Sequence, residues 1–312
     1  MDALLKRHVD DYKAIDVTTY KAMRERHFAH LNEDLSFLDG YETMVVMALS
    51  YPKSRVKYKG KGYGYVSRYA HGSDYHTIFR RKLKTITDAL ASQGYKTWAD
   101  ADISPVDERF ASYLSGLGYM GHNRFLIHPS FGTHLYLAVM LIDAPVKTTA
   151  YALDSCGDCT RCIDACPTDA LEKGGYHMER CLSQRTQVKR TLKLEEIRSI
   201  NHYVFGCDIC QIVCPKNRAI TPVHRSAFLS DDAAQLHLKA LLSMSNKQFQ
   251  KHYGHYAFAW RGASILKRNA LAILFNQKDP EVFDYARTIK AKYPDTHWLK
   301  ETIQTLLNEE KS

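Results

Sequence analysis

Over residues 41–150, short apolar runs typical of strands alternate with segments in which apolar residues recur at helical spacing. The runs TMVVMALSY, residues 43–51, and HLYLAVMLID, residues 134–143, are largely apolar, and short apolar runs predict buried strands. Between these runs two sets of apolar residues recur at helical spacing: Phe79, Leu83, Ile86 and Leu90, then Val106, Phe110, Leu114 and Leu117. The alternation of strand and helix patterns predicts an α/β domain.

The chain after residue 214 has a helical period. The segment KDPEVF, residues 278–283, is expected to be the break between two helices. Paired helices of this kind predict a fragment of a helical-repeat array. Each helix presents one apolar face, formed by Leu266, Ala270, Leu271 and Leu274 in the first and by Leu299, Ile303, Leu306 and Leu307 in the second.

All eight cysteines lie between Cys156 and Cys214, in the part of the chain between these two patterns. The first run, CGDCTRCIDACP, has the two-two-three spacing and final proline of bacterial ferredoxins that bind [4Fe–4S] clusters. The second run, CDICQIVCP, has the same ending but is one cysteine short, and Cys181 is the remaining candidate to complete it. We therefore predict two iron–sulfur clusters.

The cysteines divide between the two predicted clusters by the rule that the last cysteine of each run serves the other cluster. The alternative is a pair of structural zinc sites, since CxxC pairs also suit zinc. Zinc sites do not need the two-two-three run with its proline, which occurs here once complete and once truncated. The simplest closed arrangement is Cys156, Cys159, Cys162 and Cys214 on one cluster, with Cys166, Cys181, Cys207 and Cys210 on the other.

The charge of the chain suits a polyanionic partner. Lys and Arg number 43 against 34 Asp and Glu among the 312 residues, a formal net charge of +9, although such an excess is also compatible with a merely solvated surface. Basic residues gather around and after the second cysteine run: Arg185, Lys189, Arg190, Lys193, Arg198, Lys216, Arg218, Arg261, Lys267 and Arg268.

The cellular location is predicted from the start of the chain and from its hydropathy. The N-terminus, MDALLKRHVDDYKAIDV, lacks the features of a secretory signal, and no apolar run approaches the ~18 residues of a membrane span. We expect a cytoplasmic protein with no membrane partner.

Two segments rich in glycine, histidine and aromatic residues lie between the predicted helices, at residues 63–76 and 116–134. Glycine-rich turns let the backbone approach a flat ligand closely. Neither segment has the glycine pattern of a phosphate-binding loop. The alternative is that they are turns with surface aromatic residues.

At this point the sequence resembles the cobalamin-dependent epoxyqueuosine reductases, which complete queuosine in tRNA. The resemblance rests on VSRYAHGSDYH, ADISPVDERFASYLSGLGYMGHN, the first cysteine run, RCLSQRTQ, FGCDICQIVCPKN and WRGASILKRNAL, in this order. It implies an α+β protein of three parts: a nitroreductase-like cobalamin-binding domain (1–150), a ferredoxin-like double [4Fe–4S] module (151–222) and a helical HEAT-like segment (223–312).

The resemblance also implies partners and site residues. It implies an oxidoreductase acting on epoxyqueuosine at the wobble position of tRNA, supplied by a low-potential electron donor and expected to be a monomer. Asp102 takes the place of the acid that protonates the departing epoxide oxygen. The cobalamin-binding residues implied are Tyr69, His71, Asp74, Tyr75, His76, Gly121, His122 and Asn123.

Several residues allow other interpretations. Asp102, with Ser104, is also suited to cap the helix that follows Pro105. Asp74 with His76, and Asp295 with His297, form D-x-H pairs, but the glycine of the corrinoid lower-ligand signature is absent after both. His71 and His122 stand where the family usually has basic residues, so the charge there depends on pH.

Two other functions remain open from the sequence. The first is another corrinoid and iron–sulfur reductase of the reductive dehalogenase type, although the expected twin-arginine signal is missing and Asp102 occupies the position of the queuosine enzymes. The second is an electron carrier without catalytic activity, in which the first domain merely supports the clusters. Purification with or without a bound corrinoid distinguishes the carrier from the enzymes.

Overall fold

The structure is a computed structural model that describes residues 1–53, 56–102, 105–152, 154–221, 228, 231–295 and 297–311. Its contacts divide the chain into two compact units, each built from separate stretches of sequence. Unit 1 comprises Met1–Tyr51, Tyr75–Cys159 and Cys214–Val223, and unit 2 comprises Pro52–Asp74, Thr160–Val213 and His224–Ser312. The three-part division at residues 150 and 222 stays a prediction.

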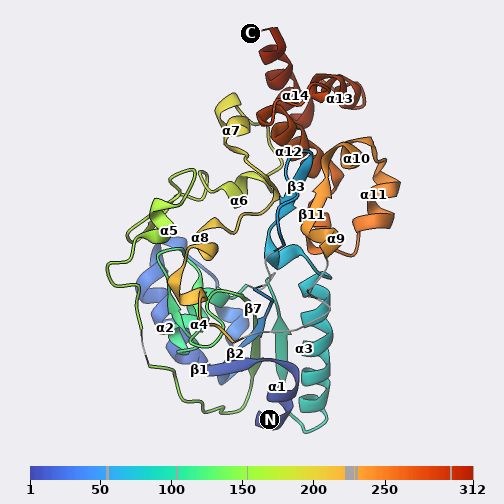
Figure 1. The fold of residues 1–312 in the computed structure, drawn as a ribbon. Coiled ribbons are helices and arrows are strands. Elements are labelled where there is room, and N and C mark those ends of the chain that lie inside the picture. Colours follow the sequence, from blue (N-terminus) through green and yellow to red (C-terminus); the bar gives the residue numbers. More distant parts are fainter. Residues whose placement is uncertain are drawn as a thin grey trace. The chain divides into compact units, whose positions relative to one another are not determined.

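Unit 1 is a four-stranded antiparallel sheet covered on both faces (Figure 1). The strand order is β1 (Asp11–Asp16), β2 (Thr43–Ser50), β7 (Leu135–Ile142) and β4 (Thr97–Asp100). Every residue of β2 is buried, because neighbouring strand residues point to opposite faces and both faces carry helices. The predicted strands at 43–51 and 134–143 are confirmed as β2 and β7.

The helices of unit 1 are α1 (Asp2–His8), α2 (Val17–Phe28), α3 (Tyr75–Ala91) and α4 (Glu108–Leu114). Helix α3 confirms the pattern from Phe79 to Leu90, all four of whose apolar residues are buried. Helix α4 is shorter than predicted: Val106 and Leu117 are buried but lie outside it. The cap at its start is Asp107, whose carboxylate accepts the Phe110 N–H at 3.0 Å, so Asp102 does not cap it, and Ser104 lies outside the described residues.

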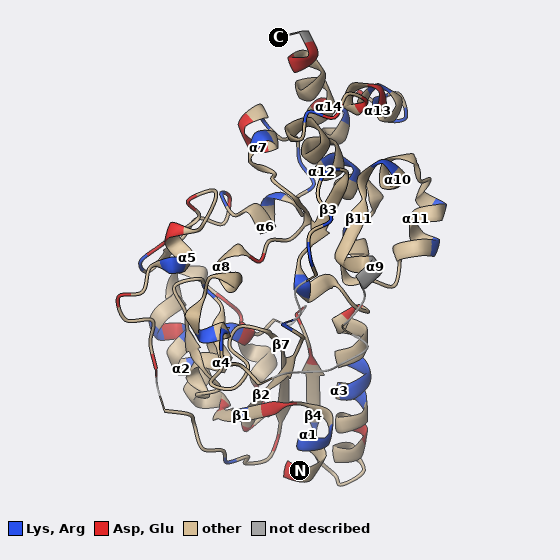
Figure 2. Ribbon diagram, in the orientation of Figure 1, with Lys and Arg blue, Asp and Glu red and all other residues tan. Residues whose placement is uncertain are grey.

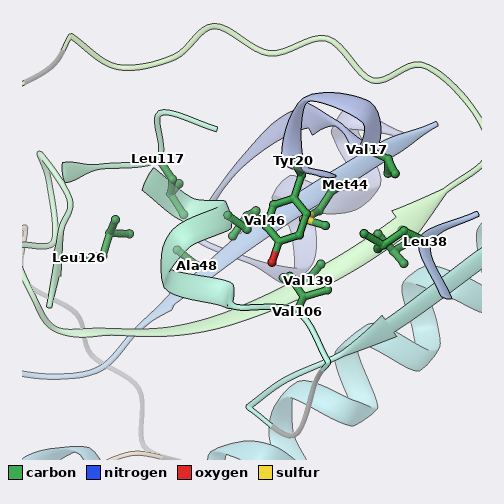
Figure 3. Packing of buried hydrophobic residues seen from close by; sticks show 12 residues of the cluster. Val17, Tyr20, Leu38, Met44, Val46, Ala48, Val106, Leu117, Leu126 and Val139 are labelled. Atoms are coloured by element: carbon green, nitrogen blue, oxygen red, sulfur yellow. The ribbon is translucent and has the colours of Figure 1, made fainter. Parts of the chain in front are cut away.

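The core between the sheet and helices α2 and α4 is apolar and surrounds one tyrosine (Figure 3). The ring of Tyr20 on α2 packs with Met44, Val46 and Val139, and its hydroxyl accepts the backbone N–H of Asp107 at 3.1 Å. The start of α4 is therefore fixed from within the core. A hairpin follows α4, formed by β5 (Tyr119–Met120) and β6 (Leu126–Ile127).

Unit 2 is mainly helical around a small mixed sheet. The strands run in the order β10 (Tyr203–Phe205), β3 (Tyr63–Val66) and β11 (Gln235–His237), with β10 parallel and β11 antiparallel to β3. The helices before β11 are short: α5 (Arg161–Asp164), α6 (Leu182–Arg185), α7 (Leu194–Ser199), α8 (Ile209–Ile212) and α9 (Asp231–Ala234). A second hairpin joins β8 (Leu171–Glu172) to β9 (Gly175–Tyr176).

The C-terminal helices of unit 2 are longer: α10 (Leu238–Ser243), α11 (Asn246–Tyr253), α12 (Ala263–Asn276), α13 (Val282–Lys290) and α14 (Trp298–Asn308). Helices α12 and α14 confirm the two predicted apolar faces. The interpretation of residues 278–283 as a simple break is wrong in part, because α13 begins at Val282 and stands between the predicted pair. Among the described residues, no helix is both long enough and apolar enough to cross a membrane.

Candidate cofactor and active site

Three of the cysteines belong to unit 1: Cys156, Cys159 and Cys214. Cys156 and Cys214 pack with Tyr119 and Ile127 of the β5–β6 hairpin, which brings the two ends of the cysteine region together. Burial raises the pKa of the Cys214 thiol, and Cys156 and Cys159 are close enough to add to that rise. Unit 1 thus gathers three of the four ligands predicted for the first cluster.

His122 lies against this cysteine loop. Its backbone N–H donates to Cys156 Sγ at 3.4 Å, and its ring Nδ1 donates to the carbonyl of Cys159 at 3.0 Å, since a carbonyl can only accept. Hydrogen bonds to cluster sulfurs help to set cluster reduction potentials. One ring nitrogen of His122, a residue expected to bind cobalamin, is thus engaged by the loop that carries the cluster ligands.

Gly121 and Asn123 form a tight turn beside His122. Gly121 donates its N–H to the Phe125 carbonyl at 2.9 Å, and a Cβ there would lie 2.6 Å from Asn123 Oδ1 and 2.7 Å from Ile127 Cδ1, so only glycine fits. Asn123 is 4% exposed, and its Nδ2 is buried without a hydrogen-bond acceptor among the described residues. A buried donor left without a partner is a place where a ligand oxygen fits.

The other five cysteines belong to unit 2: Cys162, Cys166, Cys181, Cys207 and Cys210. Burial raises the pKa of Cys207 to about 12, and Cys181 and Cys166 add to the rise. Burial raises the pKa of Cys210 well above its ordinary value, with Cys207, Cys181 and Cys162 among its neighbours. The four ligands predicted for the second cluster therefore lie near one another. The described residues contain no group of three or more His, Cys, Asp or Glu side chains arranged around a single metal ion.

Asp208, between Cys207 and Cys210, anchors their loop to residues 67–68. The carboxylate is fully buried and accepts hydrogen bonds from the Ser67 hydroxyl and, at 3.0 Å, from the Arg68 backbone N–H. Gly206 makes this approach possible: its φ is +70°, and a Cβ there would lie 2.4 Å from Ser67 Cβ. The second cysteine run and the segment VSRYAHGSD are thus one packed structure in unit 2.

Three of the predicted cobalamin-binding residues lie in that segment of unit 2: Tyr69, His71 and Asp74. His71 is 4% exposed and its Nε2 donates to the Val66 carbonyl at 2.6 Å, so that nitrogen is used within the protein. Tyr69 is half-buried, and its hydroxyl donates to Gln187 Oε1 at 3.4 Å. The Asp74 N–H donates to the His255 carbonyl at 3.1 Å.

The predicted acid and two aromatic residues meet in unit 1. His76 Nε2 lies 2.9 Å from Asp102 Oδ2, and the neighbouring Tyr75 ring stacks on Tyr136 with 4.3 Å between ring centroids. The hydrogen bond from His76 is the main cause that lowers the pKa of Asp102. Asp102 also has a φ of +65°, in the left-handed region that non-glycine residues seldom adopt.

Glu108 is the residue of this site that the sequence reasoning missed. Its Oε1 accepts the backbone N–H of Asp102 at 2.6 Å, which ties the strained residue to the first turn of α4. Burial raises the pKa of Glu108 to about 8, and nearby Asp102 adds to the rise. A signal was present: a glutamate one residue after the helix-capping Asp107 and six after the predicted acid.

Many of the basic residues noted around the second cysteine run are engaged within unit 2. Arg185 and Arg190 both pair with Glu196, at 3.6 and 2.5 Å. Arg198 pairs with Glu309 at 2.7 Å. Arg268 is 2% exposed and donates to three backbone carbonyls. Much of the basic cluster therefore stabilises the fold.

The residues present fit the groups that the sequence predicts. Cysteine thiolates are the ligands of [4Fe–4S] clusters, and each unit gathers its cysteines within mutual influence. The buried Nδ2 of Asn123 beside the close turn at Gly121 offers an unpaired donor to the polar rim of a large flat cofactor. The other residues expected to contact cobalamin are distributed over both units.

Two protein families match parts of the chain. Residues 155–217 match the family described as 4Fe-4S double cluster binding domain. Residues 35–102 match the family described as epoxyqueuosine reductase QueG, DUF1730. The first match contains all eight cysteines, and the second ends at Asp102 and includes His76.

Curated relatives match over most of the chain. The epoxyqueuosine reductase of Staphylococcus aureus (strain NCTC 8325 / PS 47) is 35% identical over 295 residues, which cover 91% of this chain and 77% of the relative. The epoxyqueuosine reductase of Bacillus subtilis (strain 168) is 31% identical over 313 residues, covering 92% and 80%.

Solved structures match as well. A crystal structure of epoxyqueuosine reductase with an epoxyqueuosine-modified tRNA-Tyr stem loop has a TM-score of 0.86 and 25% identity, covering all of this chain and 97% of that one. The Bacillus subtilis enzyme, solved with its aspartate catalytic loop swung out of the active site, has a TM-score of 0.81 and 25% identity, covering 98% and 96%.

Proposed function

Because the chain belongs to the epoxyqueuosine reductase family, we propose that it reduces epoxyqueuosine to queuosine at the wobble position of tRNA. The observation that carries the proposal is the union, in one chain, of a double-cluster cysteine module with the His76–Asp102 pair. An electron carrier needs the first feature but has no use for the second.

The reaction removes one oxygen from an epoxide and leaves an alkene, so it consumes two electrons and two protons and releases one water. When bound, cobalamin supplies low-valent cobalt for the reduction, and the two [4Fe–4S] clusters supply the electrons. Gly121 and Asn123 in unit 1, and Tyr69, His71 and Asp74 in unit 2, are the residues we assign to the cofactor's surroundings. We assign three further residues of unit 1 to the same surroundings: Tyr75 and His76, which lie beside Asp102, and His122, which lies against the cysteine loop.

Asp102 passes a proton from His76 to the departing oxygen. Its Oδ2 lies 2.9 Å from His76 Nε2, within hydrogen-bond distance, so a proton can pass between the two groups. The ionised form of Asp102 is favoured while His76 donates to it, which makes His76 the group able to replace a proton that Asp102 has lost. The aspartate catalytic loop described for the Bacillus subtilis enzyme supports this assignment.

The finer architecture and setting follow from the same proposal. We assign a nitroreductase-like fold to the cobalamin-binding domain, a ferredoxin-like fold to the double-cluster module and a HEAT-like character to the C-terminal helices. The tRNA substrate places the activity in the cytoplasm. A low-potential electron donor supplies the electrons, and the enzyme acts as a monomer.

Anaerobic conversion of epoxyqueuosine in tRNA tests the proposal. The reconstituted protein is incubated with cobalamin, a low-potential reductant and epoxyqueuosine-containing tRNA, and the nucleosides are measured by mass spectrometry. We expect queuosine from the wild type and at least a ~100-fold slower reaction from Asp102→Asn, which keeps the shape but cannot donate an acidic proton.

The matched control is Asp88→Asn, which changes an exposed aspartate on α3 that pairs with Lys84 four residues earlier. It should leave the rate unchanged. No conversion by a wild-type protein with intact clusters and bound corrinoid would contradict the proposed substrate. Equal rates for the wild type and Asp102→Asn would contradict the role of Asp102 alone.

A further inference from the structure

A long stretch of unit 2 carries no acidic residue. From residue 233 to residue 278 there is neither Asp nor Glu, although the chain as a whole is 25% charged. The same stretch contains seven basic residues, Lys239, Lys247, Lys251, Arg261, Lys267, Arg268 and Lys278. Positive charge without interspersed acids is the electrostatic pattern of a surface that meets a polyanion.

Three of these basic residues act within the fold. Lys239 pairs with Asp279 and Glu281, both at 3.1 Å, while Lys267 and Arg268 donate to backbone carbonyls. Two of the others, Lys247 and Lys251, stand on α11, which is blue at these lysines in Figure 2. Within the described part of the chain, Lys247, Lys251 and Arg261 have no ion-pair partner.

Trp260 stands out on this stretch because it is 59% exposed, more than any other large apolar residue of the described chain. It belongs to the short 3₁₀ helix η6 (Ala257–Arg261), whose Phe258 and Ala259 are buried. The helix is therefore anchored in the core, and the indole is held out from a fixed support. An exposed tryptophan side chain leaves apolar surface in water and does not stabilise the core, so it indicates a binding surface.

Arg261 lies against Trp260. The centre of its guanidinium lies 3.7 Å from the centroid of the Trp260 ring, a close cation–π contact. Its Nε is buried and finds no acceptor among the described residues. The pair thus presents one aromatic surface and one hydrogen-bond donor in need of an oxygen.

The Trp260–Arg261 pair is connected to the segment assigned to the cofactor. Just before η6, Tyr256 forms a β-bridge with Ser73, and His255 accepts the Asp74 N–H at 3.1 Å. Helix η6 also contacts η3 (Arg68–Ala70). Two segments about 180 residues apart in sequence are therefore joined within unit 2.

We infer that Trp260 and Arg261 bind an unpaired nucleotide of the RNA substrate, with a base stacked on the indole and Arg261 donating to a phosphate or base oxygen. Unpaired RNA bases stack on aromatic side chains and on guanidinium planes, whereas paired ones are not accessible to them. The inference rests on the proposed function for the identity of the RNA, a tRNA anticodon loop.

Binding of an unmodified anticodon stem-loop RNA tests the pair without any turnover. Fluorescence polarisation with labelled RNA should show that Trp260→Ala weakens binding about tenfold or more, while Trp260→Phe keeps most of the affinity. Arg261→Gln should weaken binding and reduce the slope of log K against log salt by about one, whereas Trp260→Ala leaves the slope unchanged. The matched control is Tyr176→Ala, which removes another exposed aromatic residue of unit 2.

The outcomes separate this inference from the function on which it rests. If the wild type binds and converts tRNA while Trp260→Ala binds RNA within twofold of it, the inference is overturned and the function stands. If the wild type converts tRNA but binds no stem-loop RNA, the inference is overturned and the function stands, whereas a wild type that converts no tRNA overturns the function. In turnover, Trp260→Ala should raise the KM for tRNA about tenfold or more, because the pair acts in binding.

Discussion

Two carboxyl groups near the start of α4, those of Asp102 and Glu108, have pKa values that their surroundings shift in opposite directions. His76 lowers the pKa of Asp102, while burial raises that of Glu108 to about 8. Pairs of this kind mark sites where protons are held and moved. Because Glu108 Oε1 also accepts the Asp102 N–H, the proton on Glu108 and the conformation of the predicted acid are linked.

The pH dependence of stability follows from Glu108. A carboxyl whose pKa rises from 4.5 in the unfolded chain to about 8 in the fold stays protonated in the fold while the unfolded chain ionises, so stability falls as pH rises from about 4.5 to 8. Glu108→Gln removes this loss and keeps an acceptor for the Asp102 N–H. Thermal unfolding should show equal Tm values near pH 4.5 and a more stable variant at pH 8, by on the order of 1 kcal/mol after allowance for solvent.

The control for this measurement is Glu25→Gln, which changes an exposed carboxyl on α2. Its Tm should follow the wild type across the same pH range. A Glu108→Gln variant that is equally stable or less stable than the wild type at pH 8 would show that Glu108 is ionised in the fold.

Among single residues, the sequence predicted those that a fixed spacing or a segment shared with a known family identifies. The cysteines follow from their spacing and Asp102 from the resemblance, because both are features of adjacent residues. Glu108 was missed because its importance comes from one hydrogen bond to the backbone of Asp102. The contact of His122 with Cys159 was missed for the same reason, since residues 37 apart in sequence meet only in the fold.

Helix α12 is the central element of unit 2. Two of its polar residues, Arg268 and Asn269, are buried and hydrogen-bonded to backbone carbonyls. Asn269 donates to the carbonyls of Thr186 and Val204, at 2.8 and 2.9 Å. Arg268 donates to the carbonyls of Arg185 and Val188, at 2.7 and 2.6 Å. The helix thus fixes the chain between Cys181 and Cys207, which are both predicted ligands of the second cluster.

Removal of Asn269 should therefore destabilise unit 2 and the site together. Asn269→Ala leaves two buried carbonyls without donors and opens a small cavity, so we expect a loss of about 2–4 kcal/mol in the free energy of unfolding. Denaturant unfolding of the wild type and the variant measures this loss. The control Lys278→Ala, at an exposed position after α12, should change it by less than about 0.5 kcal/mol. A similar small change for Asn269→Ala would refute the anchoring role.

Long elements with a strong period were predictable, and short ones were not. Strands β2 and β7 are largely apolar runs, and helices α3, α12 and α14 each place several apolar residues on one face, so these elements could be predicted. Strands β3, β10 and β11 have three or four residues each and exist because β3 pairs with β10, about 140 residues later, and with β11, about 170 residues later. Helix α13 was not predicted because Pro280 indicated only a break after α12, whereas a short helix begins two residues after it.

At the scale of the whole molecule, the chain crosses between its two units several times. Residues 52–74 leave unit 1 to supply β3 and the segment around His71 to unit 2, and residues 214–223 return to unit 1. Sequence motifs divide the chain by chemistry, whereas contacts divide it by packing. The cysteine region shows the difference, because Cys159 and Cys162 are three residues apart and belong to different units.

The assignment of ligands to clusters predicts what single cysteine substitutions remove. The intact protein should contain about eight irons per chain, four in each cluster. Cys181→Ala removes a ligand grouped with Cys207 and Cys210 in unit 2, and Cys214→Ala removes one grouped with Cys156 in unit 1, so each variant should keep about four irons.

Because the buried thiols of Cys207 and Cys214 have raised pKa values, iron binding must release their protons, and cluster assembly should slow as the pH falls.

Iron analysis and low-temperature electron paramagnetic resonance of the reduced variants distinguish the clusters. The double variant Cys181→Ala with Cys207→Ala should resemble Cys181→Ala alone, since both residues serve one cluster. The double variant Cys181→Ala with Cys214→Ala should lose nearly all iron. If the first pair lost all iron and the second kept half, the two runs would exchange ligands differently from the ferredoxin rule, and the path of electrons through the protein would have to be redrawn.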